Sequence, residues 1–545
     1  MRDRAILAAL ALAGAAGLAA CGGSGGGSGA TGLSADAGGK PATAPSNAPG
    51  APGRPITVAV PEDPGSLDPA AGSGDGESLH QLIYDPLVHL DANGKVVSGL
   101  ATAWKGGARK LTFTLRKDAT CADGTPVTAS LVRDNFKRME DPSLPVPNLR
   151  LNTNKFDVHA DDAKGIVSIA LDRPNSFFLE ALAHIYIVCP AGLKNDKLLT
   201  SKGAGSGPFV LTSATPGDRY VLTRRKDYKW GADGAGTAAA GFPESVTVRV
   251  VTNETTAANL LIGGQLDVAA FQGAEVSRVQ GAGKGKLDMR ALKIRSESLL
   301  YNQAPGRPMA SEAVREALTS VIDRAAFARV LTSGFGGPAT GVAGTEPIAC
   351  GYDVTGALPK GDVAQAKQRL ADDGWRAGGG GTLRKDGRPL TLQALFPPDE
   401  ASAFEYLQGA WKALGVDLRL NPKPTAAIDQ TLISGGSWDV TALYPPSSFP
   451  SAVDTLVQGA APPNGTNIGK IDNPVYDRLS ASAKKLGGAA GCEAWSKAET
   501  ELYKSADLVP VAQRQALWAW KPELTFVPQG NLKVYIPTSL RSPER

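Results

Sequence analysis

Apolar and polar residues alternate along several short segments of the chain, the first of which begins at residue 56. Alternation with a period of two is typical of β-strands that bury one face. It predicts strands at Ile56–Val60, Leu111–Leu115, Val246–Val250, Leu266–Phe271 and Val416–Leu420.

Between these strands, apolar residues recur at the three- and four-residue spacing of amphipathic helices. Strands that alternate with helices predict an α/β fold with mixed sheets. About 490 residues of such sequence predict two or more lobes. Ser311 is a predicted N-cap, because its hydroxyl can accept a hydrogen bond from the first helical turn. The helices are predicted after Thr128, over Thr256–Ile262, after Ser311, over Asp362–Asp373 and over Phe404–Leu414.

The N-terminus has a different pattern. Arg2 and Arg4 precede an apolar run of 16 residues, Ala5–Ala20, which is short for a membrane span and suits a secretory signal. The run ends in LAAC, which resembles the bacterial lipoprotein signal, whose cysteine is lipidated and becomes the first residue. We therefore expect residues 1–20 to be a signal peptide and Cys21 to carry the lipid. A plain secretory peptide with a chance cysteine is the alternative.

Residues 21–54 have the composition of a disordered, flexible tether. Of the 34 residues from 22 to 55, 29 are Gly, Pro, Ser, Ala or Thr, and Leu33 is the only large apolar residue. Such a segment buries too little apolar surface to offset the entropy of ordering it. Lipid and tether together predict a protein anchored on the outer, extracytoplasmic face of the cell membrane.

The overall composition is that of a globular protein, with 42% hydrophobic and 20% charged residues. Lys and Arg number 57 against 53 Asp and Glu, which leaves a formal net charge of +4. The sequence has no long basic run, so nucleic-acid binding has no electrostatic footprint. We expect no nucleic-acid partner.

Four cysteines accompany Cys21. An even number in an exported protein indicates disulfides, and four cysteines allow three pairings. We favour pairing within each half of the chain, and buried free thiols are the alternative. The favoured pairs are Cys121–Cys189 and Cys350–Cys492.

The sequence lacks the common catalytic and cofactor motifs. Its four histidines have no HExxH spacing, no CxxC pair occurs, and no phosphate-binding GxxxxGK[ST] loop is present. We expect no metal and no cofactor. A Ser-His-Asp triad assembled from distant residues stays open, because geometry rather than sequence order defines it. The profile favours capture of a solute over its chemical conversion.

Blocks in the order of a known family run from about residue 56 to residue 530. The longest, YDPLVHLDANGKVVSGLATAW at Tyr84–Trp104, is close to the strongest signature of the extracellular solute-binding proteins of family 5. These proteins, of the oligopeptide and dipeptide type, serve ABC importers. The other blocks that resemble the family are Ser66–Pro69, Leu111–Lys117, Asp123–Thr128, Gly205–Val210, Arg224–Trp230, Asn302, Val314–Leu318 and Ile322–Arg324.

The resemblance implies a two-lobed fold of the periplasmic-binding-protein kind (type II, cluster C), with mixed sheets and a hinge made of two crossings. The first lobe would hold residues 55–298 and 509–545, including an extra subdomain at about 80–200. The second lobe would hold residues 299–508. A ligand would lie between the lobes, which close over it and dock on the permease subunits. We expect a monomer without catalytic residues.

Peptide-binding members of the family place an Asp of the second lobe against the α-amino group of the peptide, in a pattern like W-x-x-D-Y-x-D-P. Here the predicted strand Trp438–Leu443 is followed by YPPSSFP, and Ser447 or Ser448 stands near the place of that carboxylate. Because a buried ammonium without a carboxylate is costly, we expect a modified or blocked peptide or another small polar molecule.

The resemblance also implies ligand-binding residues. Tyr444 is the strongest candidate, because Pro445 and Pro446 would hold it on a rigid turn. For Trp411 and Phe449 a place in the core is the alternative. The full set is Ser66, Leu67, Tyr301, Asn302, Trp411, Tyr444, Ser447, Ser448 and Phe449.

Together these observations predict a lipid-anchored solute-binding component of an ABC importer for peptides or related solutes. Two alternatives stay open. One is a receptor of the same fold that delivers its ligand to a sensor. The other is a secreted hydrolase with its nucleophile and base between the lobes.

Overall fold

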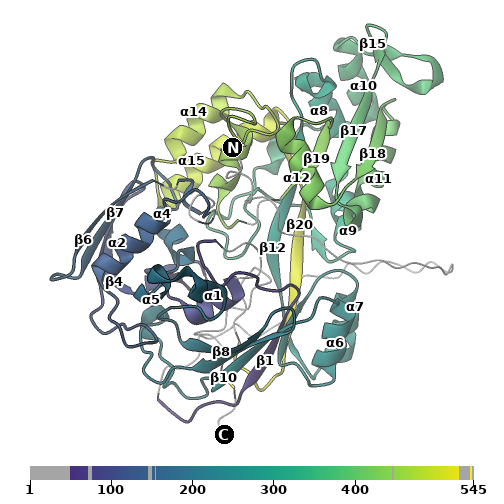
Figure 1. Ribbon diagram of the computed structural model, residues 1–545. Helices are drawn as coiled ribbons and strands as arrows, with labels where there is room; N and C mark the ends of the chain where they lie inside the picture. Colours follow the sequence, from purple (N-terminus) through teal and green to yellow (C-terminus); the bar gives the residue numbers. More distant parts are fainter. Residues whose placement is uncertain are drawn as a thin grey trace.

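Figure 1 shows the computed structural model of the chain. It describes residues 49–526, except 72–76, 92, 145, 147–149, 154 and 445–446, together with 541 and 542. The predicted signal peptide, Cys21 and most of the predicted tether lie outside these residues. The described chain folds into two lobes of mixed α/β structure, so the predicted fold class is confirmed.

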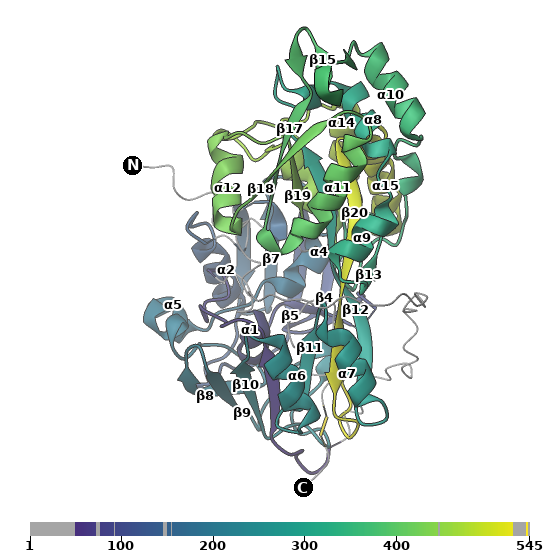
Figure 2. The same cartoon turned by 90° about the vertical axis from the view of Figure 1, so that its right-hand side faces the viewer.

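One sheet runs through the whole molecule. Its strands follow the order β18-β17-β19-β12-β20-β11-β1-β10-β9-β8, and the short β13 (Gly336–Gly337) pairs with β20. The longest strands, β12 (Asp288–Tyr301) and β20 (Leu508–Trp520), pair antiparallel from one lobe to the other. They stand upright at the centre of Figures 1 and 2, with a lobe at either end. These two strands are therefore the connections between the lobes.

The first lobe begins with β1, whose apolar sequence ITVAV is buried at four of its five positions. β1 lies parallel to β10, with Val58 opposite Val248. The predicted strand–helix–strand unit is confirmed as β10, α6 and β11, although β11 begins at Val268 rather than at Leu266. The elements of this lobe are β1 (Ile56–Val60), α1 (Glu77–Ile83), β8 (Phe209–Thr215), β9 (Arg219–Arg224), β10 (Ser245–Val250), α6 (Glu254–Ile262), β11 (Val268–Phe271) and α7 (Glu275–Gly283).

The second lobe surrounds the parallel strands β18, β17 and β19 with helices. The predicted helix after Asp362 is α10, and Asp362 caps it, because its carboxylate accepts a hydrogen bond from Gln365 N. Ser311 differs from expectation: it occupies the N-cap position of α8, but its side chain makes no capping hydrogen bond.

The second lobe also contains a small sheet made of β14, β15 and β16. The elements of the second lobe are α8 (Glu312–Ser320), α9 (Arg324–Leu331), α10 (Val363–Asp372), β14 (Arg376–Ala377), β15 (Leu383–Lys385), β16 (Arg388–Pro389), β17 (Thr391–Phe396), α11 (Ala401–Lys412), β18 (Asp417–Pro422), α12 (Thr425–Ser434), β19 (Val440–Leu443), α13 (Asp454–Val457), α14 (Pro474–Ala483) and α15 (Gly488–Lys504).

A separate four-stranded sheet lies on the left of Figure 1, in the order β4-β5-β7-β6, with α2 beside it. Its strands bury alternate residues against α2, which is capped by Thr128. Leu111, Phe113, Val132 and Phe136 belong to this core. The elements are β2 (Val88–Leu90), β3 (Val96–Ser98), β4 (Ala101–Gly106), β5 (Lys110–Leu115), α2 (Ala129–Arg138), β6 (Phe156–Asp161), β7 (Ile166–Leu171), α4 (Phe178–Ala181) and α5 (Pro190–Lys194).

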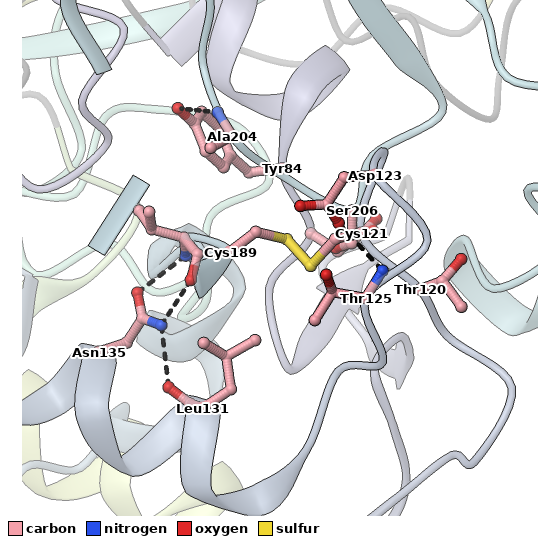
Figure 3. Close-up of a disulfide and its surroundings, with 12 residues drawn as sticks. Tyr84, Thr120, Cys121, Asp123, Thr125, Leu131, Asn135, Cys189, Ala204 and Ser206 are labelled. Carbon is pink, nitrogen blue, oxygen red and sulfur yellow. Dashed lines mark hydrogen bonds between the residues drawn. A yellow bond between two sulfur atoms is a disulfide. The ribbon is translucent and has the colours of Figure 1, made fainter. Parts of the chain in front are cut away.

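Both predicted disulfides are confirmed. Cys121 pairs with Cys189, and Cys350 with Cys492, with Cα–Cα distances of 6.1 and 5.4 Å. Figure 3 shows the first pair beside Asn135, whose amide donates to Leu131 O and Val188 O while its carbonyl accepts from Val188 N. The disulfide thus lies where the end of α2 meets the segment that leads into α5.

The body of the protein begins earlier than the predicted tether boundary. Gly50 N donates to Ala238 O, Gly53 N donates to Phe242 O, and Glu244 N donates to Gly53 O. Arg54 also forms an ion pair of 2.9 Å with Asp267. Residues 49–54 are therefore part of the first lobe. Their backbone hydrogen bonds offset the entropy cost of ordering this segment, which its composition had suggested was too high. None of the helices in the described ranges has the length and hydropathy of a membrane-crossing segment.

Candidate functional site

Four charged side chains gather where β12 and β20 pass between the lobes. Arg295 and Glu297 lie on β12, Arg514 lies on β20, and Glu400 ends the short 3-10 helix η8 (Pro398–Glu400) before α11. We call these four residues the junction cluster. Charged residues are rarely buried unless they are paired, so this group is unlike the apolar strands around it.

The local backbone of β12 brings the cluster together. The register between β12 and β20 shifts twice, between Lys293 and Arg295 and again between Glu297 and Ser298. Irregularities of this kind bend a strand and redirect its side chains. They flank Arg295 and Glu297, so the cluster occupies the irregular stretch of the long strand pair.

Glu297 is the centre of the cluster. Its Oε1 atom accepts hydrogen bonds from Arg295 Nε at 3.1 Å and from Arg514 Nε, and it lies 3.0 Å from Arg295 Nη2. The second carboxylate is held by the same guanidinium, because Arg514 Nη2 donates to Glu400 Oε1 at 3.2 Å. One edge of Arg514 therefore holds two carboxylates.

The two types of group differ in exposure. The side chains of Glu297 and Glu400 are 0% and 1% exposed, whereas those of Arg295 and Arg514 are each 16% exposed. Among the described residues, Oε2 of Glu297 and Oε2 of Glu400 have no hydrogen-bond partner, although both atoms are buried. A buried carboxylate oxygen without a donor is costly when the group is charged.

Burial and the neighbouring carboxylate of Glu297 raise the pKa of Glu400 to about 8, against the opposing effect of Arg514 and Arg295. Burial alone would lower the pKa of Arg514, but Glu297 and Glu400 raise it above its usual value. Glu400 is therefore mostly protonated at neutral pH, and the Arg514 guanidinium group stays charged.

Tyr444 covers the cluster from the second lobe. It follows β19, and its ring lies 4.5 Å from the Arg295 guanidinium carbon, a cation–π distance. Burial, followed by the nearby charges of Glu400 and Glu297, raises the pKa of Tyr444 to about 12, so its hydroxyl is neutral at physiological pH. Pro445 and Pro446, the predicted support of Tyr444, lie outside the described residues.

Ser447 and Ser448 are attached to the neighbouring segment 344–349. Ser447 O accepts hydrogen bonds from Gly344 N and Thr345 N, and the Ser448 hydroxyl donates to Thr345 O at 2.8 Å. Thr345 in turn donates to Ile294 O on β12. The two serines thus fix the loop after β19 against the strand that carries the cluster, and no carboxylate stands in their place.

Phe449 reaches the subdomain of the first lobe. Its ring stacks on Phe177, with centroids 5.0 Å apart and planes 15° from parallel. The residue before Phe177 is also held by the second lobe, because the Ser176 hydroxyl donates to Ala483 O and accepts from Trp495 Nε1. The loop from Tyr444 to Phe449 therefore spans the distance between the junction cluster and a contact between the lobes.

Four of the predicted ligand contacts are core residues in this structure. Trp411 and Tyr301 are 0% exposed and pack in the core of the second lobe, where Trp411 Nε1 donates to Leu318 O. Leu67 is buried in the first-lobe core, and Asn302 is buried with its amide donating to Trp438 O. Their packed surroundings favour a place in the core, the alternative already raised for Trp411, and contact of these four residues with a ligand stays a prediction.

Ser66 is half-buried and mainly shapes its own turn. Its hydroxyl accepts a hydrogen bond from Asp68 N, and its carbonyl lies 3.0 Å from His80 Nε2. Of the predicted set, the structure brings together Tyr444, Ser447, Ser448 and Phe449. Whether they touch a ligand stays a prediction.

Sequence reasoning did not find the junction cluster. A signal was present, because Arg514 interrupts the largely apolar strand LVPVAQRQALWAW, and Glu297 is a charged residue in the buried half of β12. Charges in strands that are buried on both faces mark either an ion-pair network or a binding site. The sequence does not show which acid meets these arginines, because Glu400 belongs to a different element and lies more than 100 residues away from each of them.

Comparison with known proteins gives a family. The model described as "Bacterial extracellular solute-binding proteins, family 5 Middle" matches residues 95–467. Among curated proteins, the periplasmic murein peptide-binding protein MppA of Escherichia coli (strain K12) is 26% identical over 508 residues, which are 87% of this chain and 90% of MppA. The glutathione-binding protein GsiB of the same organism is 28% identical over 348 residues, 62% of this chain and 65% of GsiB.

A solved structure is similar throughout. The substrate-binding protein of Microbacterium hydrocarbonoxydans, in complex with 4-hydroxybenzoate hydrazide, superposes with a TM-score of 0.69 and is 26% identical. The match covers 90% of this chain and 99% of that protein. The similarity therefore extends over both lobes and the strands that join them.

Proposed function

Because the chain belongs to family 5 of the bacterial extracellular solute-binding proteins, we propose that it captures a peptide or a related small polar molecule between its lobes. It then delivers this ligand to the permease subunits of an ABC importer. The observation that carries the proposal is the pair of long strands, β12 and β20, that join two lobes and hold buried charged residues at the junction.

The relatives indicate the range of ligands. Their names and complexes refer to a murein peptide, to glutathione and to 4-hydroxybenzoate hydrazide. These are small polar molecules, and two of them are peptides. Serines in place of the acid that pairs with a peptide amino group support a ligand that does not present a free α-ammonium at this loop.

Lobe closure would couple ligand binding to delivery. In this proposal the first lobe comprises residues 49–298 and 509–545, and the second comprises residues 299–508. A ligand that contacts both lobes favours the closed state by its difference in affinity for the two states. Tyr444 would contact the ligand from the second lobe, and the Phe449–Phe177 stack would add a contact between the lobes themselves.

The ligand test uses the full-length chain with Cys21→Ser, analysed by native mass spectrometry before and after mild denaturation. We expect release of a small molecule whose mass and composition are unchanged after incubation with the protein. A chemically altered product would favour a hydrolase instead. A protein that carries no ligand and that no peptide or polar solute stabilises in a thermal-shift screen would refute capture.

Membrane attachment through Cys21 is a separate part of the proposal. The apolar run and the LAAC sequence support lipidation, and several acyl chains hold a protein on a membrane where one chain binds only marginally. We expect the wild-type protein to sediment with membranes and to incorporate labelled fatty acid. The Cys21→Ser variant should not incorporate the label, and a labelled Cys21→Ser protein would contradict lipidation at Cys21.

A further inference from the structure

The junction cluster holds two carboxylates side by side. Glu297 Oε1 accepts from Nε of Arg514, and Glu400 Oε1 accepts from Nη2 of the same guanidinium. Nε and Nη2 form one edge of that planar group, so the two acidic groups are neighbours. Two carboxylates at such close range do not both ionise readily, and one of them retains a proton.

The charges around Glu400 decide which group keeps the proton. Both acids are buried, but Glu297 accepts from two guanidinium groups, whereas Glu400 accepts from one. Glu400, which accepts from fewer guanidinium groups, is therefore the member that keeps the proton. The groups that face Glu400 are Glu297 and Arg295 from β12, Arg514 from β20, Asp399 from its own helix and Tyr444 from the loop after β19.

In this state the cluster has an excess of positive charge. Two guanidinium groups face one carboxylate, Tyr444 is neutral, and the exposed Asp399 is screened by solvent. Among the described residues, Nη1 of Arg295 and Nη1 of Arg514 have no hydrogen-bond partner. The arginines also keep 16% exposure where the acids keep almost none. The accessible part of the cluster is thus a set of cationic N–H donors.

We propose that Arg295 and Arg514 form a subsite for a carboxylate of the ligand, with the ring of Tyr444 lying over Arg295. This inference rests on the proposed capture function and adds the class of ligand, an organic acid or a peptide with a free carboxyl group. Arg guanidinium groups present planar, paired donors that match carboxylate oxygens.

The loop after β19 also fits a site for an acidic group of the ligand rather than for an amino group. Where a ligand ammonium would need an acid, the chain has Ser447 and Ser448, whose polar atoms hold segment 344–349. The Tyr444 ring of that loop lies instead against a cation, the guanidinium group of Arg295. The site is therefore built to read the acidic end of a ligand rather than an amino end.

The arrangement couples binding to the protonation of Glu400. Ionisation of Glu400 above pH 8 would bring a second carboxylate charge against the ligand and reduce the net charge of the four residues to zero. If the form with neutral Glu400 is the one that binds, the apparent Kd rises by about tenfold from pH 7 to pH 9. Glu400→Gln, which stays neutral, should bind with the same Kd at both pH values.

The test compares matched acids and amides. The probes are a defined mixture of tripeptides and a set of substituted benzoates, each prepared as the free acid and as the carboxamide, screened by thermal shift and then titrated by calorimetry. The protein is the full-length chain with Cys21→Ser. We expect acids to bind at least about tenfold more tightly than their amides, with the loss of one charged hydrogen-bond pair as the cause.

Variants then connect this preference to the cluster. Arg295→Gln should abolish the acid preference, and Arg295→Lys, which keeps the charge and the fold but loses the paired donors, should weaken it. Arg388→Gln on β16, an exposed residue of the small sheet, is the matched control and should have no effect.

Three results would overturn the carboxylate subsite: equal affinity for acids and amides, no binding of any acid, or an acid preference that survives Arg295→Gln. A small molecule released in native mass spectrometry would still support capture in each case. Failure of the subsite and failure of the proposed function are therefore distinguishable.

Discussion

Arg514 illustrates how one side chain can organise a site. It donates to Glu297 and to Glu400, and its position on β20 joins β12 to the start of α11. A buried ion pair adds little stability over apolar packing, but removal of one partner leaves an uncompensated charge. The proposed carboxylate subsite gives a reason for keeping these buried charges that stability does not.

Asp267 is a second buried acid, with a different role. It accepts from Arg54 Nη2 at 2.9 Å and from Thr57 N at 2.7 Å, and Lys521 Nζ lies 2.9 Å away. Burial alone would raise its pKa, but the hydrogen bonds from Arg54, Lys521 and Thr57 lower it below the usual value. Asp267 thus joins the first residues of the body to the end of β20.

At the residue scale we predict that Asp267→Asn lowers the free energy of unfolding by roughly 1.5–3 kcal/mol at pH 7, the range for a hydrogen bond to a charged group. The pKa of Asp267 is depressed in the folded state. Its stabilisation is therefore present above the unfolded pKa, about 3.9, and is lost as the pH falls through the folded value. Urea denaturation at pH 7 and at pH 3 measures this.

The difference between the wild-type protein and Asp267→Asn should shrink at pH 3. The matched control is Glu523→Gln, which removes the other partner of Arg54. Its side chain is 41% exposed, and a pair with so exposed a member is worth about 0–1 kcal/mol. An equal loss of stability for both variants, or a difference that does not change with pH, would contradict the role of Asp267.

At the scale of elements, the pattern of apolar and polar residues identifies the buried face of some strands but not of others. β5 and β10 alternate apolar and polar residues, so their buried faces follow from sequence. β20 does not alternate, because both of its faces are buried along nearly its whole length. Such strands carry no periodic signal, and their polar residues must be placed by pairing.

The disulfides join elements within one lobe, and this leads to a prediction. Replacing Cys350 and Cys492 by Ser should lower the free energy of unfolding of the second lobe by roughly 2–5 kcal/mol, since the bond closes a loop with a sequence separation of 142 residues. The expected readout is a lower denaturation midpoint under non-reducing conditions.

The matched control is Cys121→Ser with Cys189→Ser. Its loop has a sequence separation of 68 residues, so the loss should be somewhat smaller and should affect the subdomain of the first lobe. Unchanged midpoints in both double variants would show that neither bond constrains the unfolded chain.

At the scale of the molecule, two of the contacts between the described parts of the lobes bear on how they open. The first is the strand pair β12 and β20, which continues the sheet from one lobe into the other. The second is the contact of Ser176 and Phe177 with α14, α15 and Phe449. Phe177 even belongs to the core of the second lobe. An opening motion about the strands would have to change this second contact.

We therefore predict that Phe449→Leu favours the open state. An aromatic pair contributes about 0.5–1.5 kcal/mol beyond its apolar area, so ligand affinity should fall by about two- to tenfold. Small-angle scattering should give a larger radius of gyration for the ligand-free variant. Phe209→Leu disrupts the Phe209–Phe242 stack inside the first lobe and is the control. If Phe449→Leu has the same radius of gyration as the wild-type protein, the Phe449–Phe177 stack does not hold the lobes together.

The local features of this protein follow largely from sequence. The strands at Ile56–Val60 and Lys110–Leu115, the helix over Val363–Asp372 and both disulfide pairs were predictable, because each depends on neighbours along the chain or on a small number of combinations. The ordered blocks also predicted the family and its two lobes.

The site was predicted less well. Tyr301 and Trp411 combine an aromatic ring with a polar atom, which suits either a core or a ligand contact, and only their packed surroundings show that they are core. The beginning of the body at residue 49 likewise depends on hydrogen bonds to residues almost 200 positions away. Composition cannot anticipate partners that are so distant in the chain.

The sequence of this chain therefore determines its elements, its cysteine pairs and its family, since these follow from periodicity, local capping and ordered motifs. The tertiary structure alone decides which charges meet. Arg295, Glu400 and Arg514 are far apart in the chain, and they form one cluster because β12, β20 and η8 converge between the lobes. Burial then raises the pKa of Glu400 and leaves the arginines as the accessible charges, a property that belongs to the assembled site.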